Sequence, residues 1–319
     1  MGLSAALEAG FFSQVTWILP LPEGGNMPGV QQVKQQLLDH GAISSEEGAS
    51  LVVNDEHIEG TLHGVPWGIY SSNNLPKIAG PAWVHIDLSY FAARYRNEIK
   101  TPIYALIGQD LKQWQQQKWP TVGATISFGN LRGNVPLGIR FLGRDLCQLL
   151  EHPGMLDGDL PRTWKLRTRA FYLENFFQKE KMLEIFNEML RLEPDNPDVL
   201  YNLYQVQRRF KDGNAALKLL ADAVQRDPVY ALEYYVLAQT ALDLHRPEAA
   251  LQMLGLAQAY QPENPVPLLR QIAILDQMEH RQPIRLLVEQ LQKMPWSSTY
   301  YPDMPRQLKA WATNLNQEN

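Results

Sequence analysis

Three short phrases, LEPDNP at 192–197, QRDPVY at 225–230 and YQPENP at 260–265, recur along the second half of the chain. Their first prolines, Pro194, Pro228 and Pro262, lie 34 residues apart. A proline that follows a helix ends it, because proline has no N–H to donate and its ring blocks the preceding turn. The spacing therefore predicts a repeated structural unit of 34 residues, each closed by a proline.

The residues between these prolines repeat in type as well as in position. Units that start at Pro197 and at Ala231 carry apolar or small residues at matching positions, which are Leu200, Leu203, Ala216, Leu220 and Ala223 in the first and Tyr234, Leu237, Ala250, Leu254 and Ala257 in the second. Small side chains at 216 and 250 allow two helices to cross closely, whereas bulky ones would force them apart. The pattern predicts helix–turn–helix units over 197–230 and 231–264.

Weaker versions of the unit lie on both sides. Residues 163–193 keep only the apolar positions of the second helix, and residues 265–294 carry Ile284 where alanine is expected. Terminal units of a solenoid differ from central ones because they also face solvent or another domain. We therefore expect about four units over 161–296, followed by a capping helix or tail at 297–319.

The period, the small-residue positions and the closing prolines resemble the tetratricopeptide-repeat (TPR) family over about 130 residues. This resemblance implies an all-α solenoid whose first helices line a concave groove that binds a peptide or a protein. The corresponding groove positions here are Tyr201, Gln205, Arg208, Tyr235 and Gln239. The Lys and Asn side chains with which some members hold a chaperone carboxy-terminus are not at these positions. The alternatives are a generic helical bundle and, for Tyr201 and Tyr235, packing between repeats.

Composition and charge narrow the class of protein. The chain has 319 residues, with 29 Lys and Arg against 34 Asp and Glu, and its net charge of −5 disfavours a nucleic-acid ligand. The one cysteine, Cys147, cannot build a disulfide framework or a cysteine-ligated zinc site. No apolar run approaches the ~20 residues of a membrane span, and the first residues lack the charged segment of a signal peptide. We expect a cytoplasmic protein with a protein or peptide partner, no nucleic acid and no membrane span.

Residues 1–160 have a different pattern, in which short apolar runs alternate with amphipathic segments and are separated by Gly, Pro and Asn. The runs and segments predict strands at 15–19, 51–54, 57–62, 82–88 and 123–128, and helices at 30–40, 109–118 and 137–150. This alternation predicts an α/β domain with a layered, mostly parallel sheet. The stretch 152–162, rich in Gly, Pro and Asp, is the expected linker to the helical repeats.

Two segments of this half, VTWILP at 15–20 and VHIDLSYF at 84–91, resemble the arginase-like (ureohydrolase) superfamily, in particular a branch that includes peptide arginases. The segment TISFGNLRGNVPL at 125–137 resembles the next strand and loop of that branch. The resemblance implies a metal-dependent hydrolase of a guanidino or amide group on a peptide. Mn²⁺ or another divalent metal would then be held by residues that include His85 and Asp87.

The departures from that superfamily weigh against catalysis. Ser89 stands where a second carboxylate is found, and no Asp-x-His-x-Asp ligand run occurs in the chain. Hard divalent ions need several carboxylates to offset their charge. We therefore expect an N-terminally truncated or catalytically degenerate domain with no cofactor. The function expected from the sequence is a protein- or peptide-interaction scaffold rather than an enzyme, and the metal-dependent C–N hydrolase is the alternative.

Overall fold

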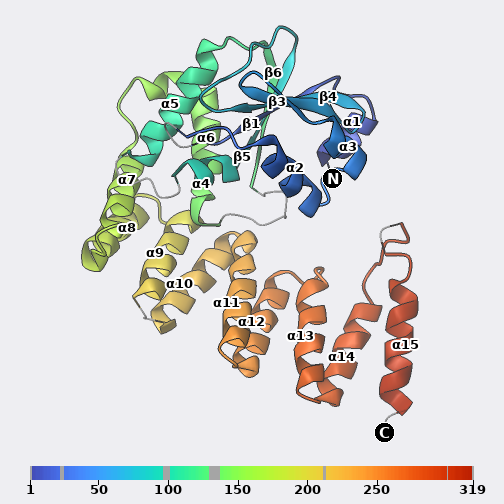
Figure 1. The fold of residues 1–319 in the computed structure, drawn as a ribbon. Coiled ribbons are helices and arrows are strands. Elements are labelled where there is room, and N and C mark those ends of the chain that lie inside the picture. The colour runs from blue at the N-terminus through green and yellow to red at the C-terminus, as the bar shows by residue number, and fades with distance from the viewer. Residues whose placement is uncertain are drawn as a thin grey trace. The chain divides into compact units, whose positions relative to one another are not determined.

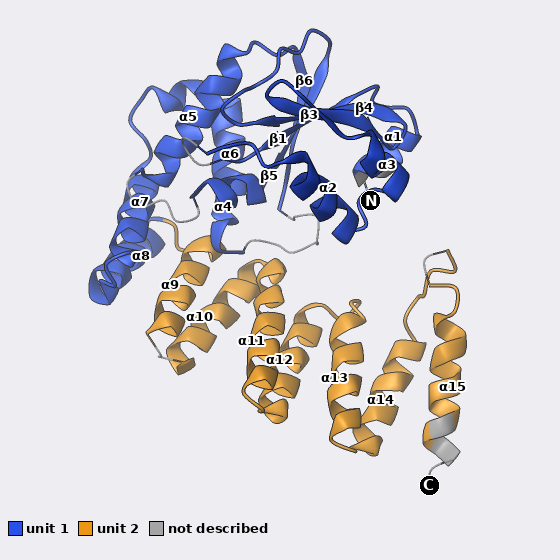
Figure 2. Ribbon diagram, in the orientation of Figure 1, with its two compact units in different colours: residues 1–192 blue, residues 193–319 orange. Residues whose placement is uncertain are grey.

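The computed structural model describes residues 2–21, 25–95, 101–128, 137–210, 213–299 and 301–317. The chain divides into two compact units, residues 1–192 and residues 193–319 (Figure 2). We refer to them as unit 1 and unit 2, and each is described by itself. No helix in the described ranges is long and apolar enough to cross a membrane.

The described residues of unit 1 form two small sheets. Strands β1 (Val15–Leu19), β2 (Val52–Asn54), β3 (His57–Leu62) and β4 (Val65–Ser71) form a four-stranded sheet in the order β1-β4-β3-β2. The β1–β4 pair is parallel, and the β4–β3 and β3–β2 pairs are antiparallel. Strands β5 (Ala82–Asp87) and β6 (Thr121–Ser127) form a separate parallel pair.

This arrangement differs from the single layered, mostly parallel sheet that the sequence pattern predicts. Only two residues separate β2 from β3, and two separate β3 from β4. A two-residue loop can join only antiparallel neighbours, because a parallel crossover needs a dozen residues or more. In the β3–β4 loop both His63 and Gly64 have positive φ angles, as the favoured two-residue hairpin turn requires.

Among the described residues of unit 1, several helices pack with the strands into two apolar cores. The helices of this unit are α1 (Gly2–Glu8), α2 (Val30–Asp39), α3 (Ser45–Ser50), α4 (Leu88–Tyr95), α5 (Ile103–Gln116), α6 (Phe141–Glu151), α7 (Arg162–Glu174) and α8 (Lys179–Leu192), with short 3₁₀ turns η1 (Leu137–Ile139) and η2 (Pro153–Leu156). Val33 and Leu37 of α2 pack with Ile58 and Ile69 of the four-stranded sheet. The second core joins β5 to helices α4–α7.

The boundary between the units lies at 192/193 rather than at the expected 160/161, because α7 is anchored in the second core. Trp164 is buried there and stacks on Tyr104 of α5, with ring centroids 4.7 Å apart. Arg167 is buried as well and forms an ion pair with Asp145 of α6 at 3.3 Å. The expected linker 152–162 therefore joins two parts of one unit.

Unit 2 is a row of helical hairpins (Figure 1). Its helices are α9 (Pro197–Arg209), α10 (Gly213–Arg226), α11 (Leu232–Asp243), α12 (Pro247–Tyr260), α13 (Val266–Gln277), α14 (Arg281–Gln292) and α15 (Met304–Gln317), with a 3₁₀ turn η3 (Pro228–Ala231). The α9–α10 and α11–α12 hairpins lie within the predicted units 197–230 and 231–264. Ala216 and Ala250 are fully buried, as close helix crossings require.

The repeated phrases mark helix starts as well as helix ends. The side-chain oxygen of Asn196 accepts a hydrogen bond from the Asp198 N–H at 2.9 Å and so caps α9, whose first residue is Pro197. Asn264 accepts from the Val266 N–H at 3.0 Å at the start of α13. At the far end, α15 packs on α14 through buried Leu308 and closes the apolar core of the last hairpin.

Candidate functional site

A buried carboxylate of α11 joins the first two hairpins of unit 2. Glu233 of α11 accepts hydrogen bonds from the hydroxyl groups of Tyr201 at 2.7 Å and Tyr204 at 2.8 Å, both on α9. Arg208, one turn beyond Tyr204, donates to the same carboxylate at 2.5 Å. The carboxylate is almost fully buried, so these three donors replace its water. We call these four residues the Glu233 cluster.

Burial dominates the electrostatics of this cluster. The pKa values of the Tyr201 and Tyr204 hydroxyls are raised far above the ordinary value of tyrosine, first because the hydroxyls are buried and second because the Glu233 carboxylate lies beside them. Both hydroxyls therefore stay protonated and act as donors. The ring of Tyr201 also lies 4.7 Å from that of Tyr230, and the Tyr230 hydroxyl donates to Asp198. The first junction is a packed interior, not an open surface.

At the second junction the equivalent tyrosine has different partners and a different exposure. Tyr235 occupies the position of Tyr201 one repeat later, but its side chain is only half-buried. Its hydroxyl donates to the Gln261 side-chain oxygen at 3.2 Å and accepts from the Asn264 amide at 3.1 Å. The guanidinium of Arg270 on α13 lies 5.4 Å from the centre of the Tyr235 ring. Burial raises the pKa of Tyr235, and the positive charge of Arg270 opposes that rise.

The structure thus separates the predicted groove residues into two groups. Tyr201 is 3% exposed and lies inside the repeat junction, so its side chain cannot reach a ligand in this conformation. Gln205, Arg208 and Gln239 are exposed, and Tyr235 is half-buried. Gln239 donates to Asp243 of its own helix at 3.0 Å. These four side chains lie on α9 and α11, the first helices of two successive hairpins.

Sequence reasoning missed Glu233, Asn264 and Arg270. The sequence did carry a signal for Glu233. It follows Tyr201 and Tyr204 by somewhat less than one repeat, so the repeat pattern places it on the first helix of the next hairpin. The burial of that acid depends on the helix packing and could not be read from the spacing. The Asn264 signal was the Asn-Pro step that both 196–197 and 264–265 share.

The residues named for a metal site lie along the β5–β6 pair of unit 1. His85 is exposed, and its ring Nδ1 lies 2.8 Å from the Thr125 hydroxyl oxygen on β6. Asp87 ends β5 and caps α4, since its carboxylate accepts from the Ser89 N–H at 2.7 Å. The Ser127 hydroxyl donates to the other carboxylate oxygen at 2.9 Å. Both oxygens of Asp87 therefore already have protein donors.

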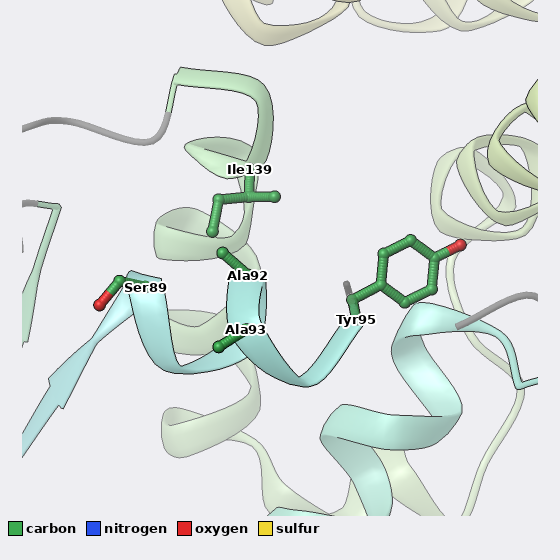
Figure 3. A pocket seen from close by; sticks show the side chains of 5 residues that line it. All are labelled: Ser89, Ala92, Ala93, Tyr95 and Ile139. Carbon is green, nitrogen blue, oxygen red and sulfur yellow. The ribbon is translucent and has the colours of Figure 1, made fainter. Parts of the chain in front are cut away.

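Within the described ranges, no three His, Cys, Asp or Glu side chains are grouped so that they could hold a metal ion. The segment 129–136, part of the stretch that resembles the ureohydrolase branch, lies outside those ranges. An open depression next to Ser89 has a volume of about 450 Å³. Figure 3 shows the side chains that line it, which are Ser89, Ala92, Ala93, Tyr95 and Ile139. Its alanine and isoleucine side chains offer a ligand little besides apolar contact.

Comparisons with known proteins gave structural likenesses only. No protein-family model matches the chain, and no curated protein matches it. A crystal structure of the MamA protein is 16% identical, with a TM-score of 0.29, and the match covers 49% of this chain and 88% of that one. TTC0263, a thermophilic TPR protein of Thermus thermophilus, is 18% identical with a TM-score of 0.24, and the match covers 49% of this chain and 93% of TTC0263. A chain of the APC/C hetero-tetramer Cut9-Hcn1 is 9% identical with a TM-score of 0.28, and the match covers 73% of this chain and 43% of that one.

Proposed function

We propose that unit 2 is a peptide- or protein-binding module, and that its ligand lies along the first helices of the hairpins. The observation that supports this most is the separation of roles on α9 and α11. Tyr201, Glu233 and their partners hold the helices together, while Gln205 and Gln239 of the same helices stay exposed at equivalent repeat positions. Exposed side-chain amides can hydrogen-bond an extended peptide backbone.

The stacked hairpins suit this role physically. Each hairpin contacts its neighbours in the row, so successive first helices present side chains at regular intervals. The Glu233 cluster fixes the spacing of two such helices before a ligand arrives. A surface that is already ordered loses less conformational entropy on binding, which favours affinity. For unit 1 we propose only that it supports the binding function of the chain, without catalysis and without a cofactor.

A peptide-display selection on the full chain tests the proposal. Twelve-residue peptides that bind the parent should lose affinity about tenfold or more for the double variant Gln205→Ala, Gln239→Ala, because each lost amide removes about one hydrogen bond. The matched control is Gln225→Ala, Gln252→Ala, which removes two exposed glutamines from the second helices α10 and α12. Equal loss in both double variants, or no selected peptide at all, would contradict the proposal.

A further inference from the structure

One side of helix α7 in unit 1 is exposed from the start of the helix to the turn that follows it. Its residues are spaced alternately by three and four positions, which places them on one side of a helix. They are Arg162, Lys165, Arg169, Tyr172 and Phe176, and all five are exposed. We call these five residues the α7 face. The opposite side of α7 is buried in the second core of unit 1 through Trp164.

The α7 face changes from charged to aromatic along its length. Its three cations come first, and its end carries the rings of Tyr172 and Phe176, whose centroids are 5.0 Å apart. Phe177 follows at the turn between α7 and α8, and each of the three rings is more than half exposed. The outer side of a terminal repeat is expected to be polar, because it faces water. Three exposed aromatic rings in one place instead mark a surface that contacts something apolar.

Within unit 2 the same side of a first helix contacts the hairpin before it. Glu233 of α11, two repeats after Lys165, accepts hydrogen bonds from α9, and Ile274 of α13, three repeats after Tyr172, is buried. Helix α7 belongs to the first hairpin of the repeats, and no earlier repeat precedes it in the described part of the chain. The exposure of the α7 face therefore follows from its position in the repeat order.

The hairpin of α7 and α8 (Figure 1) begins with a local excess of positive charge. Residues 162–181 contain six Lys and Arg and two Glu, a net charge of +4, whereas the whole chain has −5. One of these cations, Arg167, is buried against Asp145 and so adds no charge to the surface. At the turn, the exposed acid Glu180 lies between Lys179 and Lys181 in the sequence. The sign of the charge favours an anionic partner for this surface.

The cations of the α7 face are held only weakly by acids of the chain. Arg162 pairs with Glu188, and Lys165 pairs with Asp159. Ion pairs at the surface contribute little to stability, so another anion can take the place of the acid. Arg169 has no ion-pair partner among the described residues. The α7 face can therefore offer its positive charge to a ligand.

We propose that the α7 face docks unit 1 on an anionic lipid surface. Phe176 and Phe177 insert among the upper acyl chains, and Arg169 meets the lipid phosphates. Aromatic rings are favoured at the membrane–water interface, and Lys and Arg side chains next to an anionic leaflet add electrostatic attraction. This inference goes beyond the peptide-binding function proposed for unit 2 and does not rest on it.

The order of the groups along α7 favours a lipid surface over a protein partner. Phe176 follows Arg169 by seven residues, which at a rise of ~1.5 Å per residue is about 10 Å along the helix axis. Interfacial segments are buried by about 5–10 Å, across the boundary between headgroups and acyl chains. A helix that enters by its aromatic end thus brings its rings to the apolar layer and its cations to the charged layer. A bilayer offers these two layers in this order at every point of its surface.

The test is co-sedimentation of the full chain with large unilamellar vesicles. One set is phosphatidylcholine alone, and the other contains about 30% phosphatidylserine. We expect the parent to bind the anionic vesicles about tenfold more strongly. The double variant Tyr172→Ser, Phe176→Ser should lose about tenfold or more of that binding, and Arg169→Gln about fivefold. The matched controls Phe11→Ser and Lys309→Gln remove an exposed phenylalanine and an exposed lysine elsewhere and should bind like the parent.

Several outcomes would overturn the inference and leave the proposed function of unit 2 intact. They are no binding of the parent to either kind of vesicle, unchanged binding in the double variant or in Arg169→Gln, and an equal loss in Phe11→Ser. Sedimentation equilibrium without lipid covers the other occupant. A parent dimer that the double variant abolishes, with no binding to vesicles, would assign the α7 face to a second copy of the chain. Far-UV circular dichroism melts should coincide for all variants, because every substituted side chain is exposed, and Arg169→Gln decides if the double variant is unstable.

Discussion

Replacing Glu233 with leucine should destabilise unit 2 through the loss of one acceptor. Leucine is similar in size to glutamate, so the change leaves the apolar contacts of α11 nearly intact while it removes the carboxylate. The hydroxyls of Tyr201 and Tyr204 donate to that carboxylate at 2.7 and 2.8 Å and are buried with it. In the variant neither hydroxyl has this acceptor, and neither can turn to water without opening the junction.

The expected magnitude follows from these contacts. A buried donor left without an acceptor costs about 1–3 kcal/mol, and two hydroxyls are affected. The Arg208 side chain is 40% exposed, so its guanidinium can return to water and its ion pair adds about 1 kcal/mol at most. We therefore expect the free energy of unfolding to fall by about 4 kcal/mol in Glu233→Leu.

Urea unfolding followed by far-UV circular dichroism measures this loss. The control is Glu248→Leu, which changes an exposed glutamate of α12 and should stay within about 0.5 kcal/mol of the parent. The combination Tyr201→Phe, Tyr204→Phe and Glu233→Leu should recover part of the loss, because removing donors and acceptor together leaves nothing unsatisfied. The reasoning is refuted if Glu233→Leu matches the control, or if the triple variant is as unstable as Glu233→Leu alone.

Packing and capping elsewhere in the chain can be tested in the same way. Ala250→Trp should lower the stability of unit 2 by about 3 kcal/mol, because it overpacks a fully buried helix crossing; an unchanged urea midpoint would contradict the repeat register. Residues 1–192 expressed alone should melt higher than residues 1–160, since the shorter piece lacks α7, and equal melting temperatures would argue for the earlier boundary. Asp87→Ala should cost about 1 kcal/mol through loss of the α4 cap, and Asp87→Asn less, as thermal melts would show. Hydrogen bonds from the backbone of Ser44 and His63 lower the pKa of Glu47 from 4.5, so the ionised carboxylate stabilises the fold above pH 4.5 and loses this effect as pH falls through the lower pKa of the folded state. The difference in unfolding free energy between the parent and Glu47→Gln should therefore narrow on acidification, and a difference that stays constant with pH would contradict this prediction.

Local sequence patterns predict the helical hairpins of this protein and most of its strands. The 34-residue spacing of Pro194, Pro228 and Pro262, with small residues at 216 and 250, places the hairpins α9–α10 and α11–α12 correctly. These signals work because helix ends and close crossings depend on residues only a few positions apart. The same local signals located most strands of unit 1. Gln205, Arg208 and Gln239, which the resemblance to the repeat family implies as groove residues, are exposed on α9 and α11, and their role in binding stays a prediction.

Tertiary packing decided the rest, because it joins residues that no local pattern connects. Tyr201 and Tyr235 are equivalent in the repeat, yet Tyr201 is buried against Glu233, whereas Pro267 stands at the corresponding place beside Tyr235. Proline offers no side-chain acceptor there, so the Tyr235 hydroxyl bonds to Gln261 and Asn264, and the ring stays half-exposed beside Arg270.

The unit boundary was decided in the same way. Trp164 and Arg167 belong to unit 1 because their partners Tyr104 and Asp145 come from α5 and α6. The pairing of six short strands into two sheets also depended on contacts between segments distant in the chain. A burial pattern along one strand shows which face is apolar, but it does not name the strand that lies alongside.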